Sequence, residues 1–301
     1  MELLKSRKNL PQGVYLAGLV FVIVIWGICP VLTTKMYNWF SPTVYTTMTG
    51  FIASSSLFLI SGKKIKFADK SMLKVSLITG LVNAAAVISQ KIGLQYSTPS
   101  RSAFLDTLSC VVVPALMFLL TKKKPSVFKV IAAVLCLTGC FVLTGGDLSD
   151  GGGFGIGEFL CALAGILYGV NMVLTSLFAE KIYPPVHVML HMAIQCVVSI
   201  TMATALDFAN IEPMRFTLSL LPILGVIGLT LVANVVGWLI RITALKKLDA
   251  TIVAVMMPLS SVVTGTVSVL AGTDALTRNL VLGGGLVVCA SILSNLNIKR
   301  R

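Results

Sequence analysis

The chain has 301 residues, of which 56% are hydrophobic and only 12% carry a charge. A soluble chain of this length has about twice that charged fraction, so the composition excludes an ordinary soluble domain and favours a membrane protein. The formal net charge is +13, but the Lys and Arg residues stand in short clusters between apolar runs. That distribution is typical of membrane topology signals, and we expect no nucleic-acid partner.

Apolar runs recur along the whole chain, and each is close to the roughly 20 residues that a helix needs to cross a bilayer core. The first run, Val14 to about Lys35, is too long for a signal peptide, and no small-residue cleavage site follows it. The runs do not alternate in polarity, which excludes β-barrel strands. The sequence therefore predicts an all-α integral membrane protein with ten transmembrane helices, at 14–36, 42–61, 72–94, 98–121, 126–144, 155–178, 185–206, 217–244, 249–271 and 278–298.

The distribution of basic residues predicts the orientation of these helices. Of the 24 Lys and Arg residues, two lie within helices and only four lie in one set of connectors, namely Lys35, Arg101, Arg215 and Arg278. The remaining eighteen lie in the other set, which includes both termini because the helix count is even. By the positive-inside rule, both termini of this multi-pass protein are expected in the cytoplasm, in the inner or plasma membrane of the cell.

A Gly-rich connector at Gly145–Gly153 divides the ten helices into two halves of five. We predict a first repeat over 1–144, an outer linker over 145–154 and a second repeat over 155–301. An offset of 142 places Trp26-Gly27 on Tyr168-Gly169, and an offset of 151 places Asn83 on Asn234. Because five is odd, the second half enters the membrane from the opposite side. Inverted repeats of this kind are typical of transporters, whose substrate site lies at the repeat interface.

The order and duplication of several short motifs carry a resemblance to a known family. These motifs are Trp26-Gly27 with Pro30, Gly93-Leu94-Gln95-Tyr96-Ser97-Thr98 followed by Ala103-Phe104-Leu105 and Pro114, Ala244-Leu245-Lys246-Lys247-Leu248-Asp249-Ala250, and Gly283-Gly284 with Ser294-Asn295-Leu296. Over about residues 14–298 the chain resembles the drug/metabolite transporter superfamily, EamA type. The resemblance implies ten helices, a central cavity, alternating access and the export of amino acids or related metabolites.

Three ionisable residues lie within the predicted helices, where charge is costly and is a default marker of function. Asp106 lies near mid-membrane, where it either binds a substrate amine or carries a proton, or else forms a fixed ion pair with Lys91 or Arg241 or a hydrogen bond to a neighbouring helix. Arg241 either binds a substrate carboxylate or extends to the cytoplasmic interface. Lys91 lies near the outer end of its helix and either lines the cavity or extends to the outer interface.

Polar and aromatic residues complete the predicted cavity. Arg241 shares a helix face with Asn234 and Trp238, and the repeat relates this face to Asn83 and Gln90. Such faces either line a cavity or join helices. Trp26, Tyr168 and Asn171 lie near helix midpoints, where they either contact substrate or pack in the core. Pro30, Pro114 and Pro258 fall inside helices and are hinge candidates.

No motif for a cofactor, a metal or enzyme chemistry is present. The seven cysteines lie in apolar runs without zinc spacing, and His187 and His191 have no acidic or Cys ligand nearby. We expect no metal, no cofactor and no enzymatic activity. The sequence predicts a secondary transporter for a small-molecule substrate, an amino acid or related zwitterion, in the lipid bilayer. The alternatives are an exporter of small organic cations and a channel, and the sequence does not specify the oligomeric state.

Overall fold

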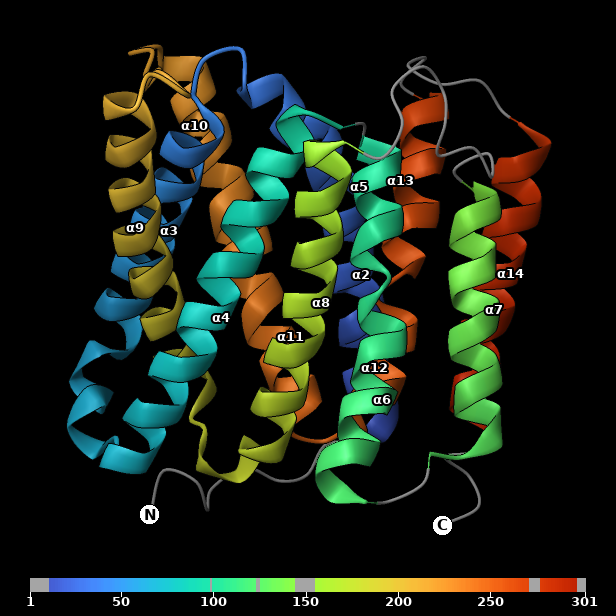
Figure 1. Cartoon of the computed structure of the whole chain (residues 1–301). Coiled ribbons are helices and arrows are strands. Elements are labelled where there is room, and N and C mark those ends of the chain that lie inside the picture. Colours follow the sequence, from blue (N-terminus) through green and yellow to red (C-terminus); the bar gives the residue numbers. More distant parts are fainter. Residues whose placement is uncertain (1–10, 98, 123–124, 144–154, 271–276, 297–301) are drawn as a thin grey trace.

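The computed structural model describes residues 11–97, 99–122, 125–143, 155–270 and 277–296. The chain passes up and down ten times between two ends of a helical bundle (Figure 1). The end at which the first helix begins is called the lower end below, and the opposite end the upper end. The helices are α2 (Gln12–Met36), α3 (Pro42–Ser61), η1 (Gly62–Phe67), α4 (Lys70–Gln95), α5 (Pro99–Asp106), α6 (Ser109–Thr121), α7 (Val127–Leu143), α8 (Ile156–Leu177), η2 (Ala179–Lys181), α9 (Pro184–Phe208), α10 (Leu220–Leu229), η3 (Thr230–Gly237), α11 (Trp238–Leu245), α12 (Ala250–Met256), α13 (Leu259–Leu270) and α14 (Arg278–Leu296).

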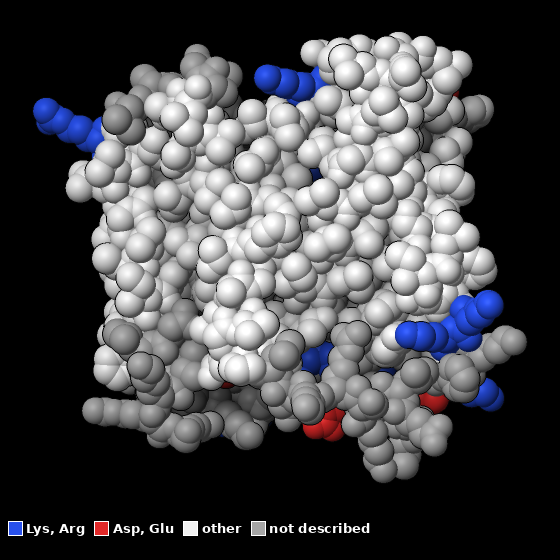
Figure 2. All heavy atoms as spheres, turned by 180° about the vertical axis from the view of Figure 1, so that it is seen from behind, with Lys and Arg blue, Asp and Glu red and all other residues white. Residues whose placement is uncertain are grey.

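The prediction of ten transmembrane helices is confirmed. Among the described residues, eight helical passes are long and apolar enough to cross a membrane, and two shorter apolar helices, Val127–Val142 and Arg278–Ser294, complete the set. Long apolar side chains cover the outside of the bundle; Leu59 is 86% exposed and Leu221 is 81% exposed. On the face shown in Figure 2, almost all charged atoms lie near the two ends, with a wide uncharged band between them. Such a surface requires lipid around it.

Repeat-related helices pack against each other. Helix α3 lies beside α9 and α7 lies beside α14, at opposite edges of the bundle (Figure 1). Each pair joins the corresponding helices of the two halves, as an inverted repeat requires. The predicted linker, 145–154, and the predicted end of the first repeat at 144 lie outside the described residues, and the predicted second repeat starts at 155, the first residue described after them.

Two of the predicted continuous helices are broken at repeat-related positions. The fourth pass stops at Asp106 and resumes at Ser109, and the ninth stops at Met256 and resumes at Leu259. The same offset of 151 that relates Asn83 to Asn234 relates Thr107 to Pro258. Pro258 explains the second break, because it lacks a backbone N–H. At the first break, helix α8 approaches closely enough that a Cβ on Gly165 would overlap the carbonyl oxygen of Leu105.

The eighth pass, predicted as one regular helix over 217–244, contains the π-helical segment η3 in its middle. π-helical turns are uncommon and occur frequently at functional sites. Here the indole Nε1 of Trp26 donates to the carbonyl oxygen of Ala233 at 3.1 Å. Trp26 also packs against Gly237, where a Cβ would lie only 2.9 Å from the same indole nitrogen. The irregular segment and the two breaks all border the same internal space.

Candidate substrate cavity

An internal cavity of about 200 Å³ lies between the two repeats. Eight of the ten predicted site residues line it, together with the hinge candidates Pro30 and Pro258. Those eight are Trp26, Gln90, Lys91, Asp106, Tyr168, Asn234, Trp238 and Arg241. Both helix breaks contribute, through Asp106 and Thr107 on one side and Met257 and Pro258 on the other. Broken helices that present polar groups at membrane depth are characteristic of transporter sites.

Asp106 is held by a hydrogen-bonded chain from two other helices. The hydroxyl of Tyr168 donates to Gln90 Oε1 at 3.0 Å, and Gln90 Nε2 donates to Asp106 Oδ2. Within the described residues, the other oxygen, Asp106 Oδ1, is buried without a hydrogen-bond partner. Lys91 lines the same space with its ammonium 5.8 Å from the centre of the Tyr45 ring. The part of the chain that the structure describes has no ion pair between Asp106 and Lys91 or Arg241 within 4.0 Å.

Arg241 forms another wall of the cavity, on α11. Its side chain is 2% exposed, with the guanidinium carbon 4.6 Å from the centre of the Trp238 ring and 5.8 Å from that of Trp26. The guanidinium stacks on these rings through cation–π contact. Considering the described residues alone, its Nε and Nη1 atoms are buried without hydrogen-bond partners. Buried donors of this kind are costly unless a ligand or water satisfies them.

Three predicted residues lie away from the cavity wall. Asn83 is fully buried elsewhere on α4, and the amide of Asn171 donates to the carbonyl oxygen of Thr79 at 2.8 Å. Pro114 lies inside α6, below the break rather than at it. The sequence placed Asn83 and Gln90 on one face, but only Gln90 lines the cavity. The two turns of helix between them put them at different depths and against different neighbours.

The sequence analysis did not identify Thr33, Tyr45, Thr49 and Gln195 as site residues, yet all four line the cavity. Thr33 Oγ1 and Tyr45 Oη are 3.4 Å apart, and Gln195 Nε2 donates to the carbonyl oxygen of Thr46 at 3.4 Å. Single hydroxyl and amide side chains in an apolar helix carry no charge signal, and they are also common at helix contacts. For Thr33 alone the sequence carries a signal, because the repeat offset of 142 relates it to Thr175.

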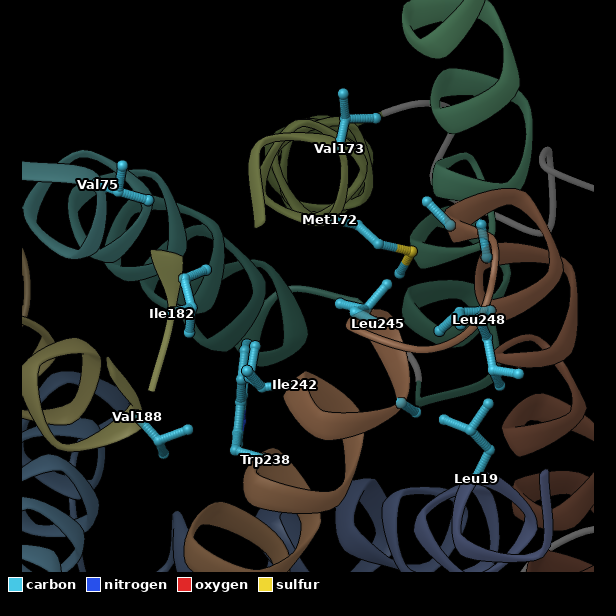
Figure 3. Close-up of a cluster of buried hydrophobic side chains, with 14 of the residues drawn as sticks. Leu19, Val75, Met172, Val173, Ile182, Val188, Trp238, Ile242, Leu245 and Leu248 are labelled. Carbon is cyan, nitrogen blue, oxygen red and sulfur yellow. The ribbon is translucent and has the colours of Figure 1, made fainter. Parts of the chain in front are cut away.

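An apolar cluster fills the space between the cavity and the lower end. Trp238, Ile242 and Leu245 extend from α11 into this cluster, where they meet Met172 from α8 and Ile182 from the connector before α9 (Figure 3). Ile242 and Ile182 are both fully buried. The cluster therefore separates the cavity from the lower surface in this conformation.

The helical bundle, the inverted repeat and the internal polar cavity define a polytopic membrane protein of the inverted-repeat class. The sequence model of the EamA-like transporter family matches residues 13–145 and again residues 155–296. The chain belongs to the EamA-like transporter family, and the resemblance expected from its motifs is confirmed.

Two further similarities agree with this assignment. The chain is 25% identical over 167 residues to an uncharacterized transporter from Archaeoglobus fulgidus. That match covers 56% of this chain and 50% of the relative, so the similarity spans about half the length of this curated protein. A solved structure named only as the crystal structure of a protein is 18% identical, covers 96% of this chain and 98% of its own, and has a TM-score of 0.77. The latter similarity shows the shared fold.

Proposed function

We propose that the chain is a secondary transporter that exports a small zwitterionic metabolite, an amino acid or a close relative, by alternating access. One observation carries the proposal: within the described residues, the same cavity presents an unpartnered carboxylate oxygen on Asp106 and unpartnered guanidinium donors on Arg241. Because Asp106 and Arg241 do not pair with each other, both are available to a ligand that carries a positive and a negative charge.

The roles of the two groups follow from their chemistry. Asp106 Oδ1 accepts hydrogen bonds from a substrate ammonium, while Gln90 holds the other oxygen in place. Arg241 offers a planar set of donors, a geometry that matches a carboxylate. Tyr168 lines the same cavity and supports this arrangement by donating to Gln90 Oε1. The rings of Trp26 and Trp238 border the same space and provide apolar contact for a substrate side chain.

The two charged cavity residues bear on the alternative substrate, and the region below the cavity bears on the alternative class of protein. An exporter of small organic cations needs Asp106 as counter-charge but has no use for a buried guanidinium. A channel needs a continuous pore, whereas the apolar cluster between the cavity and the lower end favours a carrier that opens to one side at a time. The absence of a Walker-type sequence favours secondary transport.

The test is counterflow of radiolabelled amino acids into proteoliposomes that hold the purified protein. Arg241→Ala is expected to reduce counterflow by more than about tenfold, since a charge-assisted hydrogen bond is worth ~1.5–3 kcal/mol. Arg215→Ala, at an exposed connector residue, is the matched control and is expected to transport normally. Loss of amino-acid counterflow with retained tetramethylammonium counterflow in Arg241→Ala indicates the cation exporter instead. An Arg241→Ala protein that exchanges amino acids at the wild-type rate contradicts the proposal.

A further inference from the structure

A second group of buried polar side chains lies in the lower half of the bundle. It consists of Asn83 on α4, Asn171 and Thr175 on α8, and His187 and His191 on α9, and it is called the lower polar seam below. All five side chains are fully buried. None of them lines the cavity, and the proposed substrate contacts at Asp106 and Arg241 do not use them.

The two histidines are the centre of the lower polar seam. Their rings lie 4.1 Å apart between centroids. His187 Nδ1 is 2.8 Å from Ser76 Oγ, and His191 Nε2 is 2.8 Å from Thr79 Oγ1. The Thr79 hydroxyl already donates to the carbonyl oxygen of Val75 at 2.7 Å, so it accepts from His191 Nε2–H. His191 Nδ1 then carries a free lone pair.

Much of the hydrogen-bonding capacity of the seam is unused. Considering only the described residues, His187 Nε2, His191 Nδ1, Asn171 Oδ1, Thr175 Oγ1 and both polar atoms of the Asn83 amide are buried without a hydrogen-bond partner. Each such atom costs folding free energy, and packed apolar residues in its place avoid that cost. A cluster of them within one region of a membrane protein is difficult to explain as packing. Contact with water or a polar ligand in another conformation accounts for it.

The seam continues from the cavity toward the lower end. The His191 ring packs edge-on against Trp238 at 6.2 Å, and Trp238 lines the cavity and supports Arg241. Beyond His187, the Lys246 ammonium donates to the carbonyl oxygen of Ile182 at 2.5 Å, at the lower end of α11. Ile242 belongs to the apolar cluster below the cavity, called the barrier below, and lies next to Trp238 and close to Ile182 in Figure 3.

The inverted repeat relates the seam to the cavity residue by residue. The offset of 142 places Pro42, the first residue of α3, on Pro184, the first residue of α9. The same offset places Cys29 on Asn171, Thr33 on Thr175, Tyr45 on His187 and Thr49 on His191, and the offset of 151 places Asn234 opposite Asn83. Cys29, Thr33, Tyr45, Thr49 and Asn234 all line the cavity. The seam is therefore the second copy of a cavity wall, closed in this conformation.

We propose that the lower polar seam forms the lower half of the substrate pathway, and that it binds water and the polar groups of a hydrophilic substrate when the protein opens at its lower end. This inference rests on the proposed alternating-access function. In an inverted-repeat carrier, the two repeats exchange conformations when access switches sides. The residues that are now buried around His187 and His191 then line an open cavity, and the present cavity wall closes.

The two histidines are the only ones in the sequence, which allows a direct test on the native chain. The full-length protein, purified with a tag free of histidine and placed in lipid nanodiscs, is treated with diethyl pyrocarbonate, and mass spectrometry reads modification at His187 and His191. Ile242→Ala opens the barrier beside the seam. Leu19→Ala removes the same number of carbons from the same apolar cluster, on the far side from Ile242 in Figure 3, and is the matched control.

Both histidines are expected to react in the wild-type protein despite their complete burial here. Ile242→Ala is expected to accelerate the reaction by about tenfold and Leu19→Ala by less than about twofold, because loss of a buried side chain at the barrier favours the open state. The proposal is overturned if neither histidine reacts in any variant while exposed lysines do, and while both histidines react in detergent-unfolded protein. Equal acceleration by both variants also overturns it.

Amino-acid counterflow on the same preparation separates the two proposals. Reactive histidines without counterflow support the lower pathway and contradict the zwitterion substrate. Counterflow with unreactive histidines supports the zwitterion substrate and contradicts the lower pathway.

Discussion

Asp106 uses one carboxylate oxygen to accept from Gln90 and presents the other, buried and without a partner among the described residues, to the cavity. A carboxylate in this position can hold a substrate ammonium, and it can also carry a proton across the cycle. An ionisable residue at membrane depth is the expected place for such coupling. An amide in place of the carboxylate keeps a hydrogen-bond acceptor but removes the group that gains and loses a proton.

Asp106→Asn is expected to abolish transport driven by a pH gradient, because an amide has no proton to exchange, while the Gln90 hydrogen bond survives. The measurement is uptake into proteoliposomes with and without a pH difference across the membrane. Asp207→Asn, which lies at the upper end of α9 and outside the cavity lining, is the control. Full gradient-driven uptake by Asp106→Asn contradicts the coupling role.

Asp249 caps α12 and pairs with α7 at the lower end. Its Oδ1 accepts from the Thr251 backbone N–H at 2.9 Å, and its Oδ2 lies 2.6 Å from Lys129 Nζ. Burial raises the pKa of Asp249, but the hydrogen bond and charge of Lys129, with the Thr251 bonds, outweigh it and lower the pKa overall. A depressed folded-state pKa gives stability that is present above the ordinary Asp range and is lost as the pH falls through the folded value.

Asp249→Ala is expected to cost about 1 kcal/mol at neutral pH, the typical value of an N-cap. The difference from wild type should shrink as the pH falls below the ordinary range of aspartate. Thermal unfolding across this pH range measures it, and Asp249→Asn, which keeps a capping oxygen, isolates the ion pair. A difference that grows on acidification contradicts the assignment.

At this scale the sequence predicted charged residues better than neutral ones. Asp106, Arg241 and Lys91 stood out because charge at membrane depth is rare, and all three line the cavity. Asn83 and Asn171 have the same polarity as Asn234 but lie in the closed half of the structure. Tyr45 and Thr49 gave no signal of their own. Of two residues related by the repeat, the one that lines the cavity is set by the conformation of the whole bundle, and the identity of the residue does not reveal it.

At the scale of elements, hydrophobic runs located all ten passes, and of the three irregularities only the break at the hinge candidate Pro258 had a sequence signal. Pro258 lies at the break between α12 and α13, while the break between α5 and α6 contains no proline. At the break between α5 and α6, α8 packs closely against the backbone. Only a glycine at position 165 lets α8 approach the Leu105 carbonyl oxygen in this way. The π-helical segment η3 likewise depends on contacts with α2, such as the Trp26 bond to Ala233. Long-range contacts of this kind are not visible in local sequence.

Gly165→Ala is expected to destabilise the protein by roughly 1–3 kcal/mol, the usual cost of overpacking a fitted contact. The matched control is Gly228→Ala, on a helix position where an added Cβ meets nothing within 4 Å. Thermal unfolding in lipid nanodiscs compares the two variants. Equal unfolding temperatures for Gly165→Ala and Gly228→Ala show that the α8 contact does not constrain the break.

At the scale of the whole molecule, the inverted repeat organises both the packing and the proposed cycle. Equivalent helices meet at the edges of the bundle, as α3 with α9 and α7 with α14. The sequence could predict this symmetry, because the two offsets are visible in it. It could not predict the asymmetry, in which one polar wall borders a cavity and its counterpart is closed, because both copies have similar polarity.

The orientation of the molecule remains a prediction from its charge distribution. A fluorescent protein fused after Arg301 is expected to fluoresce, since both termini are placed in the cytoplasm by the positive-inside rule. Alkaline phosphatase inserted in the predicted outer linker, 145–154, is expected to be active, because that enzyme matures outside the cytoplasm. The opposite pair of results reverses the assignment of the two sides.

Among the cavity-lining residues that the structure describes, Asp106 is the only acid. A cycle coupled through this single carboxylate exchanges one proton for each substrate molecule. One pH unit across the membrane then supplies about 1.4 kcal/mol, enough for about a tenfold concentration ratio. With a neutral zwitterion as cargo, the same proton also draws on the membrane potential, at about 2.3 kcal/mol per 100 mV. Together, one pH unit and 100 mV supply about 3.7 kcal/mol, which limits the concentration ratio that a one-proton exchange can sustain to roughly 500-fold.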